Sequence, residues 1–336
     1  MTYRVGFCCK WLNDPSECGG MKVNAKDRDL NGRSTTMRWL REHPESAEQR
    51  QWDIMNHNAA AALRMVERVG SLPKHKHMVR LGSEMLQGYT EPSWIDWWQQ
   101  ADVQRHLEQI FAPIGARARE LGVRLSFHPG QFCVLASVNE NIVERSIKEF
   151  EYHADMARWM GYGKTFQDFK INVHIAGRQG PEGIRKVLGR LSKEARNCIT
   201  IENEENSWGL DDCLSISDVV PIVMDIHHNW IREGEYIDPG SDRVKRVIDS
   251  WRGVRPAMHY SVSREDVLVG HDPEMLPDMP ALLAAGFKKQ KLRAHSDFMW
   301  NRAVNEWAAS FSTNFDIQVE AKGKNLARDQ FVDSFV

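Results

Sequence analysis

Short apolar runs that end in a histidine or an acidic residue recur along this chain, and helix-like segments separate most of them. The clearest run covers residues 123–128, ends in His128 and is stopped by the turn-forming pair Pro129 and Gly130. Barrel enzymes build their active sites from strands of this kind, each delivering a polar side chain to its carboxyl end before a loop and a helix. The pattern therefore predicts parallel strands whose ends converge on a functional site.

Eight such runs predict eight strands. The expected strands cover residues 3–7, 77–81, 123–128, 169–175, 198–203, 221–228, 256–260 and 315–320. Helices are expected at about 47–69, 103–121, 139–160, 211–216, 242–251 and 300–310. The strands are apolar almost throughout, which is typical of parallel strands buried on both faces. The chain is therefore expected to belong to the α/β class.

Two α/β architectures fit this alternation, a TIM-type (β/α)8 barrel and a doubly wound sheet. Polar residues close many of the strands, whereas a doubly wound sheet gathers its functional groups at one switch point, so the barrel is favoured. No dinucleotide-binding or P-loop motif follows a strand, which argues against those two kinds of site. We expect one barrel domain over residues 1–336, with irregular insertions at about 11–45 and 261–290.

Composition narrows the class of protein further. The formal net charge is −2, so the chain as a whole does not indicate nucleic-acid binding, although a local patch or bound metal ions can supply a positive field. The six cysteines are scattered without a CxxC pair, which is typical of reduced thiols in a cytoplasmic protein. No run is long and apolar enough to span a membrane, and we expect no signal peptide.

Thirteen histidines are the first indication of metal chemistry. Histidines and acids at or near the expected strand ends form one candidate set: His128, His174, Glu202, Asp225, His228, His259, His295 and Glu320. Five imidazoles and three carboxylates exceed what one ion needs and suit two or three divalent ions with open positions for water and substrate. Six further histidines are expected to be packed or surface residues: His43, His57, His75, His106, His153 and His271.

A cluster of this kind suits phosphodiester hydrolysis, because bound ions can generate hydroxide near neutral pH and neutralise the attacked phosphate. Glu202 is the carboxylate we expect to bridge two ions. Sugar isomerisation in a metal barrel stays open as an alternative, although such sites usually contain more carboxylates and fewer histidines. Hydride transfer has no cofactor motif to support it.

At these residues the chain resembles the UV damage endonucleases. The motifs that carry the resemblance are HPGQF at 128–132, EN at 202–203, DIHH at 225–228, WRG at 251–253, PAMH at 256–259 and VEAKGK at 319–324. The resemblance implies a TIM barrel related to endonuclease IV and a cluster of divalent ions, commonly manganese, with zinc, magnesium and cobalt as alternatives. It also implies that double-stranded DNA is nicked 5′ of UV photoproducts or other distorting lesions, leaving a 3′-hydroxyl and a 5′-phosphate.

The resemblance assigns metal binding to the eight residues of the candidate set, with Glu202, Asp225, His228 and Glu320 also in catalytic roles. Gln131 and Phe132 stand where the family has a Gln-Tyr pair that wedges into the duplex at the lesion, where unstacking costs less. The alternative for Phe132 is an ordinary core position in the loop. Candidates for phosphate contact are Arg80, Lys322 and Lys324, each of which could equally be an ion-pair partner.

One departure from the family concerns a lysine, which can be carboxylated, two residues before the histidine that matches His259. Ala257 occupies that position, so we expect the site to lack a lysine near the metals. Three other functions stay open: an endonuclease IV-like abasic-site enzyme, a metal-barrel isomerase, and a lesion-binding protein without catalysis. The resemblance further implies a monomer that acts on damaged DNA in the cytoplasm, with no membrane partner.

Overall fold

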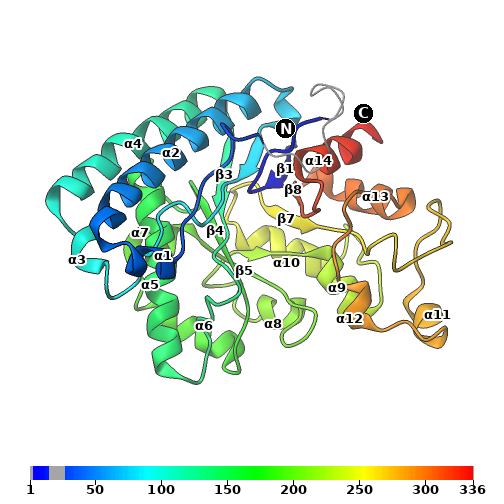
Figure 1. Cartoon of the computed structure of the whole chain (residues 1–336). Coiled ribbons are helices and arrows are strands. Elements are labelled where there is room, and N and C mark those ends of the chain that lie inside the picture. Colours follow the sequence, from blue (N-terminus) through cyan, green and yellow to red (C-terminus); the bar gives the residue numbers. More distant parts are fainter. Residues whose placement is uncertain (1–2, 15–26, 336) are drawn as a thin grey trace.

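Eight parallel strands form a nearly closed barrel, as the sequence predicted (Figure 1). The computed structural model describes residues 3–14 and 27–335. The strands are β1 Val5–Cys8, β2 Met78–Arg80, β3 Arg124–Phe127, β4 Lys170–His174, β5 Ile199–Glu202, β6 Ile222–Val223, β7 Ala257–Tyr260 and β8 Asp316–Val319. They are ordered β6-β5-β4-β3-β2-β1-β8-β7, and each hydrogen-bonded pair of strands is parallel.

The barrel closes where β6 meets β7, the two ends of the strand order. A full ladder does not form there. Instead, the His259 amide donates to the Met224 carbonyl over 3.0 Å, and Asp225 and His259 form an isolated parallel bridge. This seam consequently brings Asp225, two residues after β6, next to His259 near the carboxyl end of β7.

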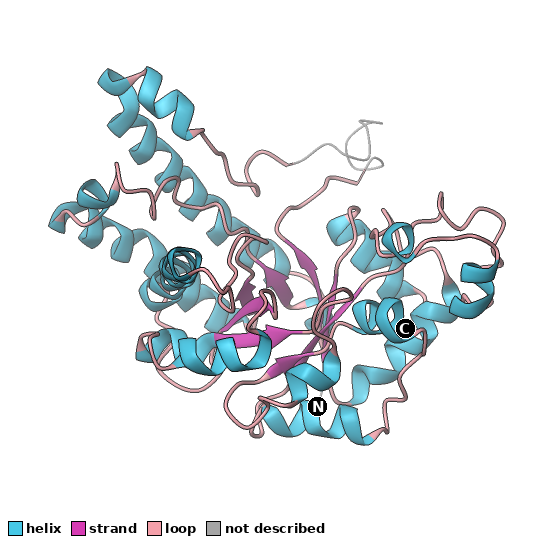
Figure 2. Ribbon diagram, turned by 90° about the horizontal axis from the view of Figure 1, so that it is seen from below, coloured by secondary structure: helices cyan, strands magenta, loops and turns pink. Residues whose placement is uncertain are grey.

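Helices surround the strands, which lie in the centre of the molecule in Figure 2. They are α1 Met37–Glu42, α2 Pro44–Gly70, α3 Ile95–Trp98, α4 Ala101–Leu121, α5 Glu140–Trp159, α6 Gly180–Leu188, α7 Lys193–Cys198, α8 Leu210–Leu214, α9 Ile226–Glu233, α10 Asp242–Ser250, α11 Met279–Ala284, α12 Lys289–Leu292, α13 Arg302–Ala309 and α14 Lys324–Asp333. Short 3₁₀ turns cover Lys74–Lys76 and Ser310–Thr313. No helix in the described ranges is long and apolar enough to cross a membrane.

Two glycines set the position of α4 against its neighbours. A Cβ atom on Gly115 would lie 1.8 Å from the Met160 carbonyl oxygen, so only glycine lets α4 pack this closely against the end of α5. Gly122 ends α4 with a φ of 67°, a left-handed conformation that glycine adopts without strain. The sequence prediction that Gly122 closes this helix is confirmed.

Three sequence expectations are wrong or incomplete. The strand expected at 221–228 ends at Val223, because the Asp225 carboxylate accepts the His228 amide hydrogen bond and caps α9 instead. The final helix α14 was not expected. The region at 11–45 contains α1, although residues 15–26 of it lie outside the described residues.

The second expected insertion, at 261–290, is more ordered than the sequence indicated. It contains α11 and the first part of α12. Leu268 and Met279 from this region pack with Trp230 and Ile231 of α9 into a small apolar cluster separate from the main core. The region is therefore held to the barrel through α9.

The amino ends of the strands enclose a buried ion-pair cluster. Asp316 begins β8 and is completely buried. Its Oδ2 atom lies 2.8 Å from Arg124 Nη1 and 3.5 Å from Arg4 Nη1, and its Oδ1 atom lies 2.8 Å from Arg255 Nε. The Arg4 amide also donates to Asp316 Oδ1 over 2.9 Å. Both carboxylate oxygens are thus fully satisfied by neighbouring cations.

Candidate metal centre

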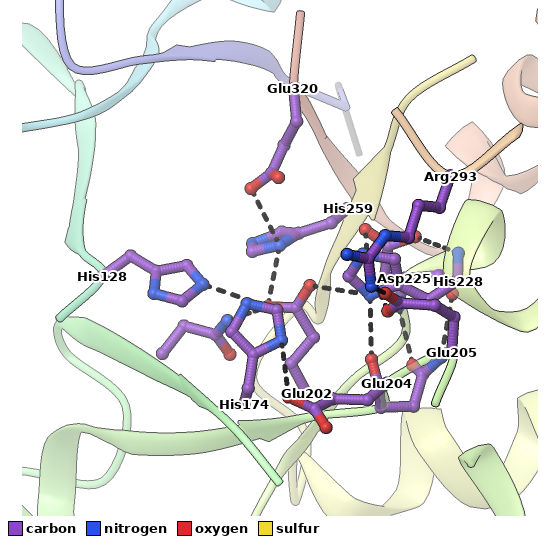
Figure 3. Close-up of polar contacts among 12 residues, drawn as sticks. His128, His174, Glu202, Glu204, Glu205, Asp225, His228, His259, Arg293 and Glu320 are labelled. Carbon is purple, nitrogen blue, oxygen red and sulfur yellow. Dashed lines mark hydrogen bonds and ion pairs between the residues drawn. The ribbon is translucent and has the colours of Figure 1, made fainter. Parts of the chain in front are cut away.

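The predicted ligands come together at the carboxyl ends of the strands, where their side chains point toward one another (Figure 3). His174 ends β4, Glu202 ends β5, and His259 is the third residue of β7. His128 and Glu320 follow directly after β3 and β8. These five groups therefore reach the same mouth of the barrel from five different strands.

The remaining two members of the mouth come from the amino end of a helix. Asp225 is the N-cap of α9 and His228 lies in its first turn, so the pair belongs to a helix start and not to a strand end as expected. Asp225 Oδ1 accepts the His228 amide hydrogen bond over 2.7 Å. The Asn203 side chain holds the Asp225 backbone on both sides, accepting from its amide and donating to its carbonyl over 2.9 and 3.0 Å.

The ligand atoms fall into three interlocking groups, within each of which all chosen atoms lie within 4.8 Å of one another. The groups are His128 with His174 and Glu202, Glu202 with Asp225 and His228, and Asp225 with His259 and Glu320. Glu202 and Asp225 each belong to two groups. A carboxylate in that position has two oxygens with which to contact two neighbouring ions.

Glu202 lies at the centre of the cluster and is completely buried. Its Oε2 atom lies 3.2 Å from His128 Nε2 and 3.1 Å from His259 Nδ1, and it also accepts a hydrogen bond from the Asn172 side-chain amide. Burial alone would raise the pKa of Glu202, but the imidazoles of His259 and His174 outweigh it and hold this pKa well below its usual range. The carboxylate is therefore ionised and available to a cation.

In Asp225 and His228, unlike in Glu202, the surroundings raise the pKa values. Burial raises the pKa of Asp225 to about 7, against the opposing effect of His228. Burial also disfavours the charged form of His228, but Asp225, Glu202 and Glu205 outweigh it and raise the pKa of His228 to about 9. His228 Nδ1 lies 3.0 Å from the Asn203 carbonyl oxygen, which fixes the ring.

Several buried atoms of the cluster have no hydrogen-bond partner among the described residues. They are Glu202 Oε1, Asp225 Oδ2 and His174 Nδ1. Leaving a buried polar atom unpaired costs about 1–3 kcal/mol. Carboxylate oxygens and imidazole nitrogens are the ligands that divalent ions such as zinc and manganese take in proteins. The unpaired atoms and the chemistry of the donor set therefore fit a cluster of metal ions.

His295 and Arg80 lie at the edge of this cluster, and both contact Glu320. His295 Nδ1 is 3.9 Å from Glu320 Oε2, so His295 lies nearby but is not part of the three groups. Arg80, expected to contact phosphate, is largely buried and pairs with Glu320 Oε1 through Nη1. Burial would raise the pKa of Glu320, but Arg80 and His259 outweigh it and hold this pKa well below the usual range.

The expectation that the site has no lysine is wrong. Ala257 does occupy β7, but Lys170 at the start of β4 places Nζ 2.9 Å from His259 Nε2 inside the barrel. Burial lowers the pKa of Lys170 to about 7, with Glu202 opposing this shift. Residues 170, 172 and 174 share one face of β4, so a lysine in register with His174 was a signal that the sequence contained.

Two acids that follow β5 were also missed. Glu204 Oε1 lies 3.9 Å from His174 Nδ1, and Glu205 Oε2 lies 3.8 Å from His228 Nε2. Glu205 Oε1 also pairs with Arg293 Nη1 at 2.9 Å. The sequence signal was the run Glu202-Asn203-Glu204-Glu205 directly after a strand, of which only the first acid entered the candidate set.

The candidate lesion-binding pair lies in the loop after β3, which also carries His128. Phe132 is 85% exposed and Gln131 is exposed as well, so the alternative of a core position for Phe132 is wrong. Lys322 Nζ lies 3.2 Å from Asp297 Oδ1, and Lys324 is half-buried at the start of α14. The loop after β3 therefore carries both the candidate ligand His128 and the exposed ring of Phe132.

Comparison with known proteins shows the family. The family model described as UV-endonuclease UvdE matches residues 18–334. A putative UV-damage endonuclease of Acanthamoeba polyphaga mimivirus is 32% identical over 185 residues, which is 52% of this chain and 56% of that protein. The chain thus spans little more than half the length of that relative.

Two crystal structures share the fold. SacUVDE superimposes with a TM-score of 0.70 at 22% identity, covering 98% of this chain and 97% of that one. Endonuclease IV from Thermus thermophilus gives a TM-score of 0.51 at 11% identity, covering 82% of this chain and 92% of that one. With the family model spanning nearly all of the residues and the barrel placing seven of the expected ligands at one mouth, the chain belongs to the UV-endonuclease family.

Proposed function

We propose that the protein is a metal-dependent DNA repair endonuclease that cuts 5′ of UV photoproducts or other distorting lesions and leaves a 3′-hydroxyl and a 5′-phosphate. The observation that carries this proposal is the set of three interlocking ligand groups, with unpaired buried atoms, at the mouth of a barrel of this family. The abasic-site, isomerase and lesion-binding alternatives become outcomes of the test below.

In this proposal two or three divalent ions, manganese first among them, are held by the candidate set: His128, His174, Glu202, Asp225, His228, His259, His295 and Glu320. Bound ions stabilise the charge of the attacked phosphate and supply a nucleophile from water near neutral pH. Neighbouring residues of the chain keep the proposed ligands in position. Glu202 and Asp225 each connect two ligand groups. Asn172 donates a hydrogen bond to the Glu202 carboxylate, and the Asn203 side chain holds the backbone of Asp225.

Recognition of the lesion falls to Gln131 and Phe132. The Phe132 ring is exposed on the loop that begins with the ligand His128, four residues earlier, so a base step contacted by the ring lies near the scissile phosphate. A lesion weakens stacking, which lowers the cost of inserting a side chain there. Stacking of a base on an aromatic ring contributes about 1–3 kcal/mol.

The test is a nicking assay on irradiated and intact duplexes of one sequence, with Mn²⁺ added. We expect nicks only in the irradiated duplex and 3′ ends that a DNA polymerase extends. Gln131→Ala with Phe132→Ala should keep metal content but lose discrimination between the two duplexes. Cleavage mainly at abasic sites would contradict the proposal and indicate an endonuclease IV-like activity. Binding to irradiated DNA without nicking would indicate a lesion-binding protein. A protein with no affinity for DNA would favour the isomerase alternative.

A further inference from the structure

A groove of about 1190 Å³ extends from the candidate metal centre across the carboxyl ends of β1, β2 and β3. The candidate ligand His128 and the exposed ring of Phe132 both line it. Its apolar wall includes Ala61, Ala62 and Met65 of α2. The groove is therefore continuous with the proposed active site and large enough to hold more than a single side chain.

Four exposed cations line this groove from two directions. Lys10 and Arg33 belong to the segment after β1, and Arg145 and Lys148 lie three residues apart on α5. None of the four forms an ion pair within residues 3–14 and 27–335; the Arg145 side chain only donates to the Asn141 carbonyl over 3.3 Å.

Two exposed arginines elsewhere on the surface, by contrast, are paired with acids. Arg190 pairs with Glu140 and Glu144, and Arg185 pairs with Asp218. The four groove cations therefore keep their full charge toward solvent, whereas those two arginines are neutralised by acids of the same chain.

Two acids of the groove lie between the two cationic flanks. Glu84 and Glu91 belong to the segment after β2, and the strand order places β2 between β1 and β3. A third acid, Glu149, is next to Lys148 on α5, but it is half-buried and accepts a hydrogen bond from Thr90 Oγ1 over 3.4 Å. Anionic ligand groups are consequently expected at the flanks of the groove and not along its middle.

We propose that Lys10, Arg33, Arg145 and Lys148 bind phosphates of the substrate DNA backbone beside the cut site. This inference rests on the proposed function, since it names where the DNA lies on the same mouth. It differs from the sequence expectation, in which Arg80, Lys322 and Lys324 contacted phosphate, because Arg80 and Lys322 have acidic partners within the protein.

The physical basis is local charge. The chain has a formal net charge of −2, so long-range attraction of DNA by the whole protein is weak. Phosphate contacts by lysine and arginine release counterions and lower the logarithm of the binding constant with the logarithm of salt, by about 0.9 per contact for duplex DNA. Such contacts fix position without reading the base sequence or the lesion.

The test measures binding of irradiated and intact duplexes over about 50–200 mM salt, with a chelator present to prevent cleavage. Two double variants, Arg145→Gln with Lys148→Gln and Lys10→Gln with Arg33→Gln, each remove one flank. We expect each to lower the salt slope by about 2, and to weaken binding to both duplexes by the same factor. With Mn²⁺, KM for irradiated DNA should rise while kcat stays unchanged.

Lys193→Gln is the matched control. Lys193 is also exposed and has no ion pair among the described residues, but it begins α7 before β5, at the opposite end of the barrel. Salt slopes of the double variants equal to that of the control would overturn the inference, as would weaker binding to the irradiated duplex alone. A wild-type protein that leaves irradiated DNA intact would overturn the proposed function instead, whatever the salt slopes.

Discussion

Both ends of the barrel contain buried carboxylates, but only those at the amino ends of the strands have partners for both oxygens. At the amino ends, Asp316 is surrounded by Arg4, Arg124 and Arg255, and each of its oxygens has a cationic partner. At the carboxyl ends, Glu202 and Asp225 are just as buried, yet each keeps an oxygen without a hydrogen-bond partner among the described residues.

This difference separates structural charge from functional charge. A buried carboxylate whose neighbours complete its hydrogen bonds has no capacity for a further ligand, and removing a partner mainly destabilises the protein. Carboxylates with unpaired atoms cost stability in the isolated protein, and that cost is relieved when a cation binds. The hydrogen bonds at the base of the barrel are therefore complete, whereas the mouth keeps buried donor atoms open to a cation.

The largest effect is expected from Glu202→Gln at the mouth. The substitution keeps the shape of the side chain but removes the charge that two ligand groups share. We expect nicking of irradiated DNA to fall by a factor of about 10²–10³, by analogy with the loss of one charge-stabilising group, and bound metal to decrease. The measurements are a nicking assay and elemental analysis of the purified variant. Retained activity at full metal content would contradict the shared role of Glu202.

Asp316→Asn at the base should change stability and not chemistry. It leaves Arg4, Arg124 and Arg255 without a counter-charge, so we expect a loss of about 3–5 kcal/mol in the free energy of unfolding. Denaturant unfolding followed by circular dichroism measures this loss. Metal content per folded molecule should equal that of the wild type; a lower metal content would show that the two ends are coupled and would break the comparison.

Lys170→Met tests a residue between the two ends. It leaves His259 Nε2 without its 2.9 Å partner, and loss of a group that orients a ligand typically lowers metal affinity by about 10–100-fold. Metal titration by calorimetry measures the change, and Lys193→Met is the control on the surface. If both variants bind metal like the wild type, Lys170 has a structural role only and does not orient His259 for metal binding.

The smallest effect is a pH dependence confined to the mouth. Asp225 and His228 have pKa values raised to about 7 and about 9, so both hold protons near neutrality that an incoming cation must displace. As pH rises from about 6 to about 9 these protons are lost, and metal affinity should increase over that window. Metal titrations at several pH values measure this trend. An affinity that is flat or falls with pH would show that other groups control binding.

The sequence predicted the barrel and most of the mouth because both depend on local patterns. Apolar runs followed by helices identify parallel strands, and the side chains at strand ends must converge once the barrel closes. The expected strand at 221–228 failed because the apolar run continues past the point where Asp225 caps α9, and only tertiary structure shows the turn. The partners in cross-barrel contacts, such as His259 for Lys170 and Glu320 for Arg80, are far apart in the chain. The register of β4 indicates which face Lys170 shares, but no local pattern indicates either partner.

The incomplete ladder between β6 and β7 means that a cation bound at the mouth would also have a structural role. Asp225 lies just beyond one margin of the sheet and His259 on the other, and with Glu320 they form one ligand group. A cation held there would fasten the two margins together where backbone hydrogen bonds are few. Binding of that cation would then join the two edges of the barrel and complete the proposed catalytic site in the same step.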